Sequence, residues 1–163
     1  MKRNFIPRFI EKQYLNKRYK GKFQAVTLFM DIVGFTSMTE TLMNYGKEGA
    51  EVLSEIINKT FDSAINSIYS KNGWILSFAG DAFTAVFTGK KVLNSISSAI
   101  KIRDIFKDLK IKTKFGEFKF NVRIGLSYGL VKWRIISGPK QSLFYFFGEG
   151  LDQCSDSEHH CKP

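Results

Sequence analysis

The sequence predicts an α+β domain in which helices pack on a β-sheet. Short apolar runs typical of strands alternate with longer segments whose apolar residues recur every three or four positions. These segments follow the order strand, helix, hairpin, helix and then three strands. The chain has 163 residues, of which 44% are hydrophobic and only three are prolines. Such a chain is long enough for one hydrophobic core.

Residues 1–22 form a basic lead-in segment before the predicted domain at residues 23–163. This segment carries eight lysines and arginines, and Glu11 is its only acid. We expect a helix that lays an apolar stripe on the domain, with a membrane-surface or nucleic-acid arm as the alternative. Neither this segment nor any later run is apolar enough for a signal peptide or a bilayer span. We therefore expect no transmembrane segment and a cytoplasmic location.

The formal net charge of +10 favours anionic partners such as nucleotides, nucleic acids or acidic lipids. Both cysteines and both histidines lie in the terminal stretch CSDSEHHC, so a zinc site has to be considered. Adjacent histidines point in different directions on a helix, and no second ligand pair occurs elsewhere. We expect these residues to be ordinary helix residues.

The first half of the chain predicts a strand, a long helix and a hairpin. Residues 25–32 are apolar enough for a strand buried on both faces. Residues 46–72 have the spacing of an amphipathic helix, which Gly73 ends. Residues 74–79 and 82–87 read as two strands joined by a turn at Gly80 and Asp81.

The second half predicts one more helix followed by three strands. Helical spacing returns over residues 92–109. The strands are expected in FKFNVRIGLSYG, LVKWRIIS and SLFYFFG, and a polar, helix-like tail follows them.

Two aspartates stand at the ends of apolar strands. Asp31 follows VTLFM, and Asp81 lies in the hairpin turn. A buried carboxylate needs a compensating partner, and two carboxylates at neighbouring strand ends repel each other unless cations neutralise them. Such oxygen ligands suit Mg²⁺ or Mn²⁺. Taken singly, Asp81 is most simply a turn residue.

A glycine turn follows Asp31 directly. The chain passes through Gly34, Phe35 and Thr36, and a helix is expected to start near Ser37. Backbone N–H groups at the start of a helix attract phosphate oxygens. Metal-binding carboxylates beside such a turn describe a nucleoside-triphosphate site.

The motifs LFMDIVGFTSMTE and FAGDAFTAVF resemble the two metal-site motifs of class III nucleotide cyclases. GKEGAEVLSEIIN and FNVRIGLSYGLV fall where that family places a long helix and a later strand. The resemblance covers residue 23 to the end and is nearest to the first catalytic half of soluble, bicarbonate-responsive adenylyl cyclases and their bacterial relatives. It implies a ferredoxin-like fold related to the polymerase palm, with a mostly antiparallel sheet and head-to-tail dimers.

The resemblance also implies roles for individual residues. Asp31 and Asp81 would bind two Mg²⁺ or Mn²⁺ ions, together with the carbonyl oxygen of Ile32. Arg123 would contact the triphosphate of ATP or GTP, although an outward-facing strand cation is its simpler reading. The remaining nucleotide-binding positions would be Val33, Gly34, Phe35, Thr36 and Gly80.

Three positions depart from the family pattern. Ser77 stands where many cyclases have a purine-reading lysine, and Asp152 and Asp156 stand where an asparagine and a transition-state arginine are expected. An acid cannot stabilise negative charge that grows on a phosphate. Asp152 could accept a hydrogen bond from a purine amino group or be a surface acid. We therefore expect a C-terminally incomplete cyclase half that needs a complementary half or a homodimer partner.

The principal prediction is a metal-dependent cyclase half that acts on ATP ahead of GTP. A catalytically silent nucleotide-binding or regulatory module is the main alternative. A palm-type dinucleotide cyclase or polymerase is disfavoured because its hairpin normally carries paired acids at the turn. A nucleic-acid binder would rest on charge without a recognition motif, so no nucleic-acid partner is expected.

Overall fold

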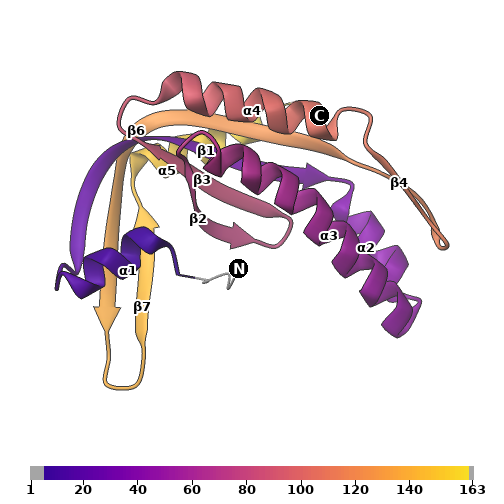
Figure 1. The fold of residues 1–163 in the computed structure, drawn as a ribbon, viewed down its shortest axis with the longest axis horizontal. Coiled ribbons are helices and arrows are strands. Elements are labelled where there is room, and N and C mark those ends of the chain that lie inside the picture. Colours follow the sequence, from indigo (N-terminus) through magenta and orange to yellow (C-terminus); the bar gives the residue numbers. More distant parts are fainter. Residues whose placement is uncertain (1–5, 162–163) are drawn as a thin grey trace.

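The computed structural model describes residues 6–161. Its helices and strands are mixed along the chain, and the first and last elements are helices (Figure 1). In chain order the elements are α1 (Arg8–Leu15), β1 (Lys20–Val33), α2 (Phe35–Met43), α3 (Gly46–Tyr69), β2 (Trp74–Ala79), β3 (Ala82–Thr88), α4 (Val92–Phe106), β4 (Lys110–Thr113), β5 (Gly116–Lys119), β6 (Asn121–Ser137), β7 (Ser142–Phe147) and α5 (Glu149–His159). The α+β class predicted from the sequence is confirmed.

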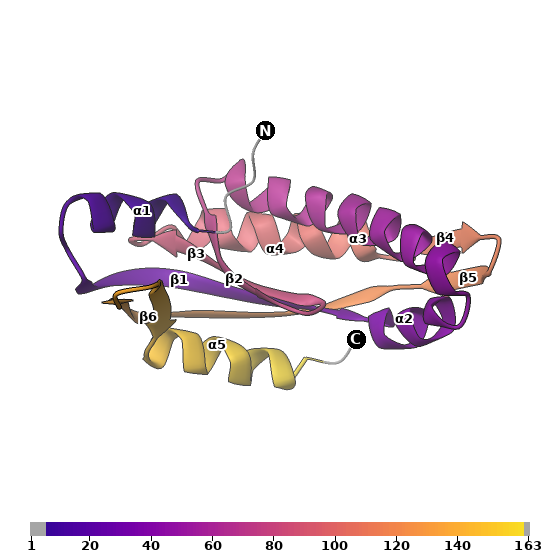
Figure 2. The same cartoon turned by 90° about the horizontal axis from the view of Figure 1, so that it is seen from below.

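The main sheet has five strands in the order β2-β3-β1-β6-β7, and all neighbouring strands are antiparallel. Its centre is the long pairing of β1 with β6, which runs from Lys20 opposite Arg134 to Val33 opposite Asn121. Figure 2 shows α3 and α4 on one side of this sheet and α5 on the other. The domain therefore has three layers, and the sheet with β1, β3 and β6 is the middle one.

The main core lies between the sheet and the pair α3 and α4. The inward residues of β1 alternate with period two, as Leu28 and Met30 illustrate, and both are fully buried. They meet residues at helical spacing, such as Ala64 and Ile68 of α3 and Ile102 of α4. The strand residues with period two and the helix residues with period three to four thus form the two sides of one core.

The predicted bounds of α3, β2, β3 and α4 agree with the structure to within a few residues. The sequence predicted one strand ending at residue 129 and a second beginning at residue 130. This division is wrong, because β6 continues without a break from Asn121 to Ser137. Gly129 marks a close approach instead of a turn: a Cβ placed there would lie 2.8 Å from the Cα of Gly150 in α5. The short hairpin β4–β5 was not predicted.

The lead-in segment contains a helix, α1, that packs on the sheet. Ile10 is buried against Trp133 and Ile135 of β6, and the ring of Phe9 stacks on Trp74 at 5.3 Å. Residues 1–5 of the lead-in segment lie outside the described residues. Because β1 begins at Lys20, the predicted boundary at residues 22 and 23 falls inside a strand, and the division stays a prediction.

Candidate functional site

Asp31 and Asp81 lie at the same end of adjacent strands. Asp31 is near the end of β1, opposite Ala82 of β3, the residue that follows Asp81. The backbone N–H of Ile32 donates a hydrogen bond to the carbonyl oxygen of Asp81 at 3.3 Å. Both aspartates line an open, polar hollow of about 420 Å³. The expected convergence of the two acids is therefore found.

Asp31 has a partner within the chain, the guanidinium of Arg123. These residues face each other across the β1–β6 pair, and Nη2 of Arg123 donates to Oδ2 of Asp31 at 2.5 Å. The side chain of Asp31 is 19% exposed. The hydrogen bond to Asp31 raises the pKa of Arg123 above its usual range, and the nearby charge of Glu158 adds to this shift. Arg123 is therefore a charged group of the hollow and not an isolated outward cation.

Glu158 of α5 completes a cluster of three charges around this arginine. Its Oε1 lies 2.9 Å from Nε of Arg123, although the two atoms are not aligned for a hydrogen bond. The Glu158 residue is only 2% exposed, which is rare for a glutamate unless a cation neutralises it. We call Asp31, Arg123 and Glu158 the acid–arginine–acid cluster.

Sequence reasoning missed Glu158. Gly150, Cys154 and Glu158 recur every four residues and form the buried side of α5, but this spacing alone does not show which side of the helix packs on the sheet. Asp152 and Asp156 lie off this line and are exposed. Among the acids of α5, Glu158 therefore reaches the site region, whereas Glu149, Asp152 and Asp156 face solvent.

The turn after Asp31 depends on Gly34. Its φ of +96° is in a region that favours glycine, and a Cβ would lie 2.5 Å from the carbonyl oxygen of Lys119. Gly34 is the N-cap of α2. This helix begins at Phe35, two residues before the start expected near Ser37. Val33, Gly34 and Thr36 line the hollow with Ile32. Phe35 instead packs partly against the core.

Gly80 forms the hairpin turn beside the site. Its φ is +63°, and no atom would lie within 4 Å of a Cβ there. The glycine supplies turn geometry and is not among the residues that line the hollow, whereas Asp81 is. The structure thus places Gly80 next to the site without showing it inside.

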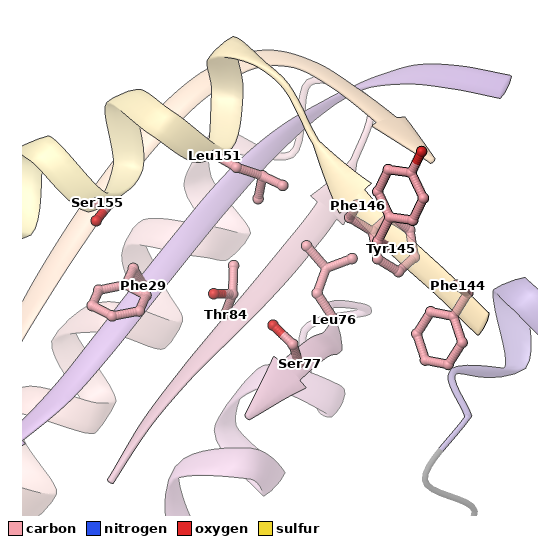
Figure 3. A pocket seen from close by; sticks show the side chains of 9 residues that line it. All are labelled: Phe29, Leu76, Ser77, Thr84, Phe144, Tyr145, Phe146, Leu151 and Ser155. Carbon is pink, nitrogen blue, oxygen red and sulfur yellow. The ribbon is translucent and has the colours of Figure 1, made fainter. Parts of the chain in front are cut away.

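A second hollow of about 440 Å³ lies on the same face of the sheet. Phe29 lines it, and this residue is two positions before Asp31 on β1. Ser77 and Thr84 face each other across β2 and β3, with Ser155 on the facing helix α5 (Figure 3). The other residues that line it are Leu76, Phe144, Tyr145, Phe146 and Leu151.

The two positions predicted to read the purine, Ser77 and Asp152, therefore do not lie in one hollow. Ser77 contributes to the second hollow, but Asp152 is exposed and does not line it. Ser155 takes part instead and was missed by sequence reasoning. It lies one helical turn after Leu151, which lines the same hollow.

The terminal cysteines contact β6 separately. The thiol of Cys154 donates to the carbonyl oxygen of Gly125, and that of Cys161 to the carbonyl oxygen of Ile124. Burial raises the pKa of Cys154. Within residues 6–161, no three or more His, Cys, Asp or Glu side chains gather in a group that could hold a metal ion.

Residues 18–163 match the family described as the adenylate and guanylate cyclase catalytic domain. The chain belongs to this family. Adenylate cyclase type 10 of Homo sapiens is 33% identical over 135 residues, which cover 80% of this chain and 8% of that protein. Guanylate cyclase beta of Plasmodium falciparum is 31% identical over 136 residues, which cover 76% of this chain and 4% of that protein. The domain thus spans a small fraction of these curated relatives.

Solved cyclase structures share the fold. A bacterial light-regulated adenylyl cyclase superposes with a TM-score of 0.77 at 18% identity, covering 95% of this chain and 46% of that one. The adenylyl cyclase CyaB of P. aeruginosa gives 0.69 at 19% identity, covering 86% and 73%. The cyclase domain of RhGC from Catenaria anguillulae, solved with GTP, gives 0.68 at 21%, covering 87% and 76%. Among the described residues, no helix is long and apolar enough to cross a membrane.

Proposed function

We propose that this domain is the metal-bearing half of a nucleotide cyclase that converts a purine nucleoside triphosphate into the 3′,5′-cyclic monophosphate and pyrophosphate. The observation that carries the proposal is the convergence of Asp31 and Asp81 beside a glycine turn in one polar hollow. ATP is proposed ahead of GTP because the adenylate cyclase relatives match a larger share of the chain, 80% against 76%. A cytoplasmic location is proposed with it.

The donor set of the hollow fits Mg²⁺ or Mn²⁺. Two carboxylates, Asp31 and Asp81, and the backbone carbonyl of Ile32 offer the oxygen ligands that these hard cations prefer. Two such ions would lower the pKa of the ribose 3′-hydroxyl and offset the charge of the phosphates. Arg123 is already beside Asp31, so it orients this carboxylate before any ligand arrives.

The other residues of the hollow would bind and orient the triphosphate. The backbone from Val33 to Thr36, at the start of α2, offers N–H groups to phosphate oxygens. Arg123 can turn toward a phosphate while its Nε stays beside Glu158. In the reaction, the 3′-oxygen bonds to the α-phosphorus, the bond to the departing pyrophosphate breaks, and the hydroxyl proton passes to solvent.

A complementary half is proposed because this chain lacks several charge-stabilising groups. Ser77 brings a hydroxyl where the family pattern has a lysine, and Asp152 and Asp156 face solvent. The partner, a second cyclase half or a second copy in a head-to-tail arrangement, would supply a lysine, an asparagine and an arginine. Each missing charge-stabilising donor typically costs about 10²–10³ in rate.

A silent regulatory module is the second candidate. The acid–arginine–acid cluster favours it, because Asp31 is already neutralised by Arg123 without any metal. In that case nucleotide would bind and no cyclic product would form, even with a complementary half.

The test is an assay of the purified 163-residue chain with MnATP and with MnGTP, with and without a complementing cyclase half. Product is measured by chromatography, and nucleotide binding by calorimetry. We expect weak binding and almost no turnover by the chain alone, and turnover once the half is added. Brisk turnover without a partner would contradict the half-site proposal. Binding without turnover in the complemented assay would establish the silent module.

A further inference from the structure

The far end of the β1–β6 pair carries four cations on one face. Lys20 lies opposite Arg134, and Lys22 lies opposite Lys132. Alternate residues of a strand point to the same side, so all four side chains share one face of the sheet. All four are exposed. Like charges directly opposite each other destabilise a sheet, so this arrangement is unfavourable in the free chain.

No acid relieves this repulsion within the described part of the chain. None of the four cations forms an ion pair there. The same face continues along β1 and β6 through Gln24, Tyr128 and Leu130, which are uncharged. The nearest compensation is aromatic: Nζ of Lys132 lies over the ring of Phe147 at 5.9 Å.

Exposed apolar residues border the cations toward the tip of the β6–β7 hairpin. Ile136 and Leu143 are opposite each other and are 50% and 56% exposed. Behind them Tyr145 lies opposite Arg134, and Phe147 lies opposite Lys132. We call this set the basic ribbon face: Lys20, Lys22, Lys132, Arg134, Ile136, Leu143, Tyr145 and Phe147. Of these, Tyr145 also borders the second hollow.

The opposite side of the same ribbon is already covered. Trp133 and Ile135 are buried there against α1, and Phe144 and Phe146 join the same cluster. Figure 1 shows the ends of β6 and β7 projecting from the helical layers, with the connecting turn farthest out. The basic ribbon face is therefore the uncovered side of a projecting hairpin.

We propose that the basic ribbon face docks the domain onto an anionic lipid surface. Its aliphatic side chains lie at the tip, and behind them aromatic rings lie in the same rows as the cations, Tyr145 with Arg134 and Phe147 with Lys132. This order matches a bilayer interface, where aliphatic side chains enter the acyl region and aromatic and cationic side chains lie at headgroup depth. An acidic protein would complement the cations but would not require bare aliphatic residues at the tip. This inference does not depend on the proposed cyclase activity.

The test measures binding of the whole chain to vesicles of phosphatidylcholine with phosphatidylserine, and to vesicles of phosphatidylcholine only, by co-sedimentation. We expect binding to the anionic vesicles, weakened by salt. The double variant Lys22→Gln with Lys132→Gln should bind roughly 25-fold more weakly, because each cation near an anionic surface contributes about fivefold. Ile136→Ser with Leu143→Ser should remove the share of binding that survives high salt.

The matched control is Lys59→Gln with Lys101→Gln. These lysines are exposed on α3 and α4, and their removal changes the net charge equally. Equal loss in the control would show non-specific adsorption of a basic protein and overturn the proposal. Tight binding to single-stranded RNA without vesicle binding would assign the face to nucleic acid. Self-association that Ile136→Ser with Leu143→Ser abolishes, again without vesicle binding, would assign it to a second copy.

Discussion

The two ends of the β1–β6 pair carry charge in opposite ways. At one end Asp31 faces Arg123, and buried Glu158 adds a second acid, so the cation is neutralised inside the chain. At the other end Lys20 faces Arg134 and Lys22 faces Lys132, and no described acid neutralises them. Compensated charge can be held in a fixed position before a ligand arrives. Uncompensated charge gains most from a partner, which is why we assign the two ends to different ligands.

The largest expected effect comes from removing charge at the compensated end. Asp31→Asn and Asp81→Asn should each reduce cyclisation in a complemented assembly at least 10²-fold, because an amide keeps the shape but not the charge that would hold metal ions. Mn²⁺-dependent product formation, followed by chromatography, measures this. Asp104→Asn is the matched control, since Asp104 is an exposed acid on α4. Retained turnover in either site variant would remove that residue from the site.

An intermediate effect is expected from breaking the buried part of the cluster. Glu158→Ala should lower the free energy of unfolding by about 2–3 kcal/mol, because Nε of Arg123 loses its partner and a cavity opens. Urea denaturation measures the change. Asp156→Ala, an exposed acid on the same helix, should change it by less than about 0.5 kcal/mol. Equal stability of Glu158→Ala and the native chain would mean that this pair contributes nothing.

The smallest effect is expected from converting the uncompensated end into a compensated one. Lys22→Glu would place an acid opposite Lys132 and should raise the free energy of unfolding by about 0.5 kcal/mol. The same denaturation experiment measures it. Gln24→Glu introduces the same acid on the same face but opposite the uncharged Leu130, and it changes the net charge by one unit where Lys22→Glu changes it by two, so it should stabilise less. A lower stability of Lys22→Glu would show that the lysines do not repel each other in the folded chain.

The sequence predicted the elements best where one periodicity ran between clear stop signals. The helix α3 and strands β2 and β3 are of this kind, with Gly73 and Gly80 as their boundaries. Gly129 misled the prediction because a glycine in a strand can mark either a turn or the close approach of another backbone. Here α5 lies against β6, and a Cβ on Gly125 would be 2.2 Å from the carbonyl oxygen of Cys154. That contact joins distant segments and leaves no local pattern.

The residues of the site, like the helices and strands, were predictable where the signal is local in the sequence. Asp31, Asp81 and the Gly34 turn stand out because polar residues at apolar strand ends need an explanation. Glu158 did not stand out, since its burial depends on how α5 docks on β6. Asp152 was assigned by resemblance and proved to be exposed, while Ser155 lines the second hollow. A helix position identifies a face only when the helix itself has been placed.

The central strand pairing also governs how the chain must be made. Thr27 of β1 meets Ser127 of β6, a residue 100 positions later, and their hydroxyls lie 2.9 Å apart. At a synthesis rate of about 5–20 residues per second, that edge of β1 waits roughly 5–20 s for its neighbour. Throughout this interval an apolar strand edge is open to wrong partners. Nascent chains stalled before residue 120 should therefore engage chaperones more strongly than chains released after β6 has emerged.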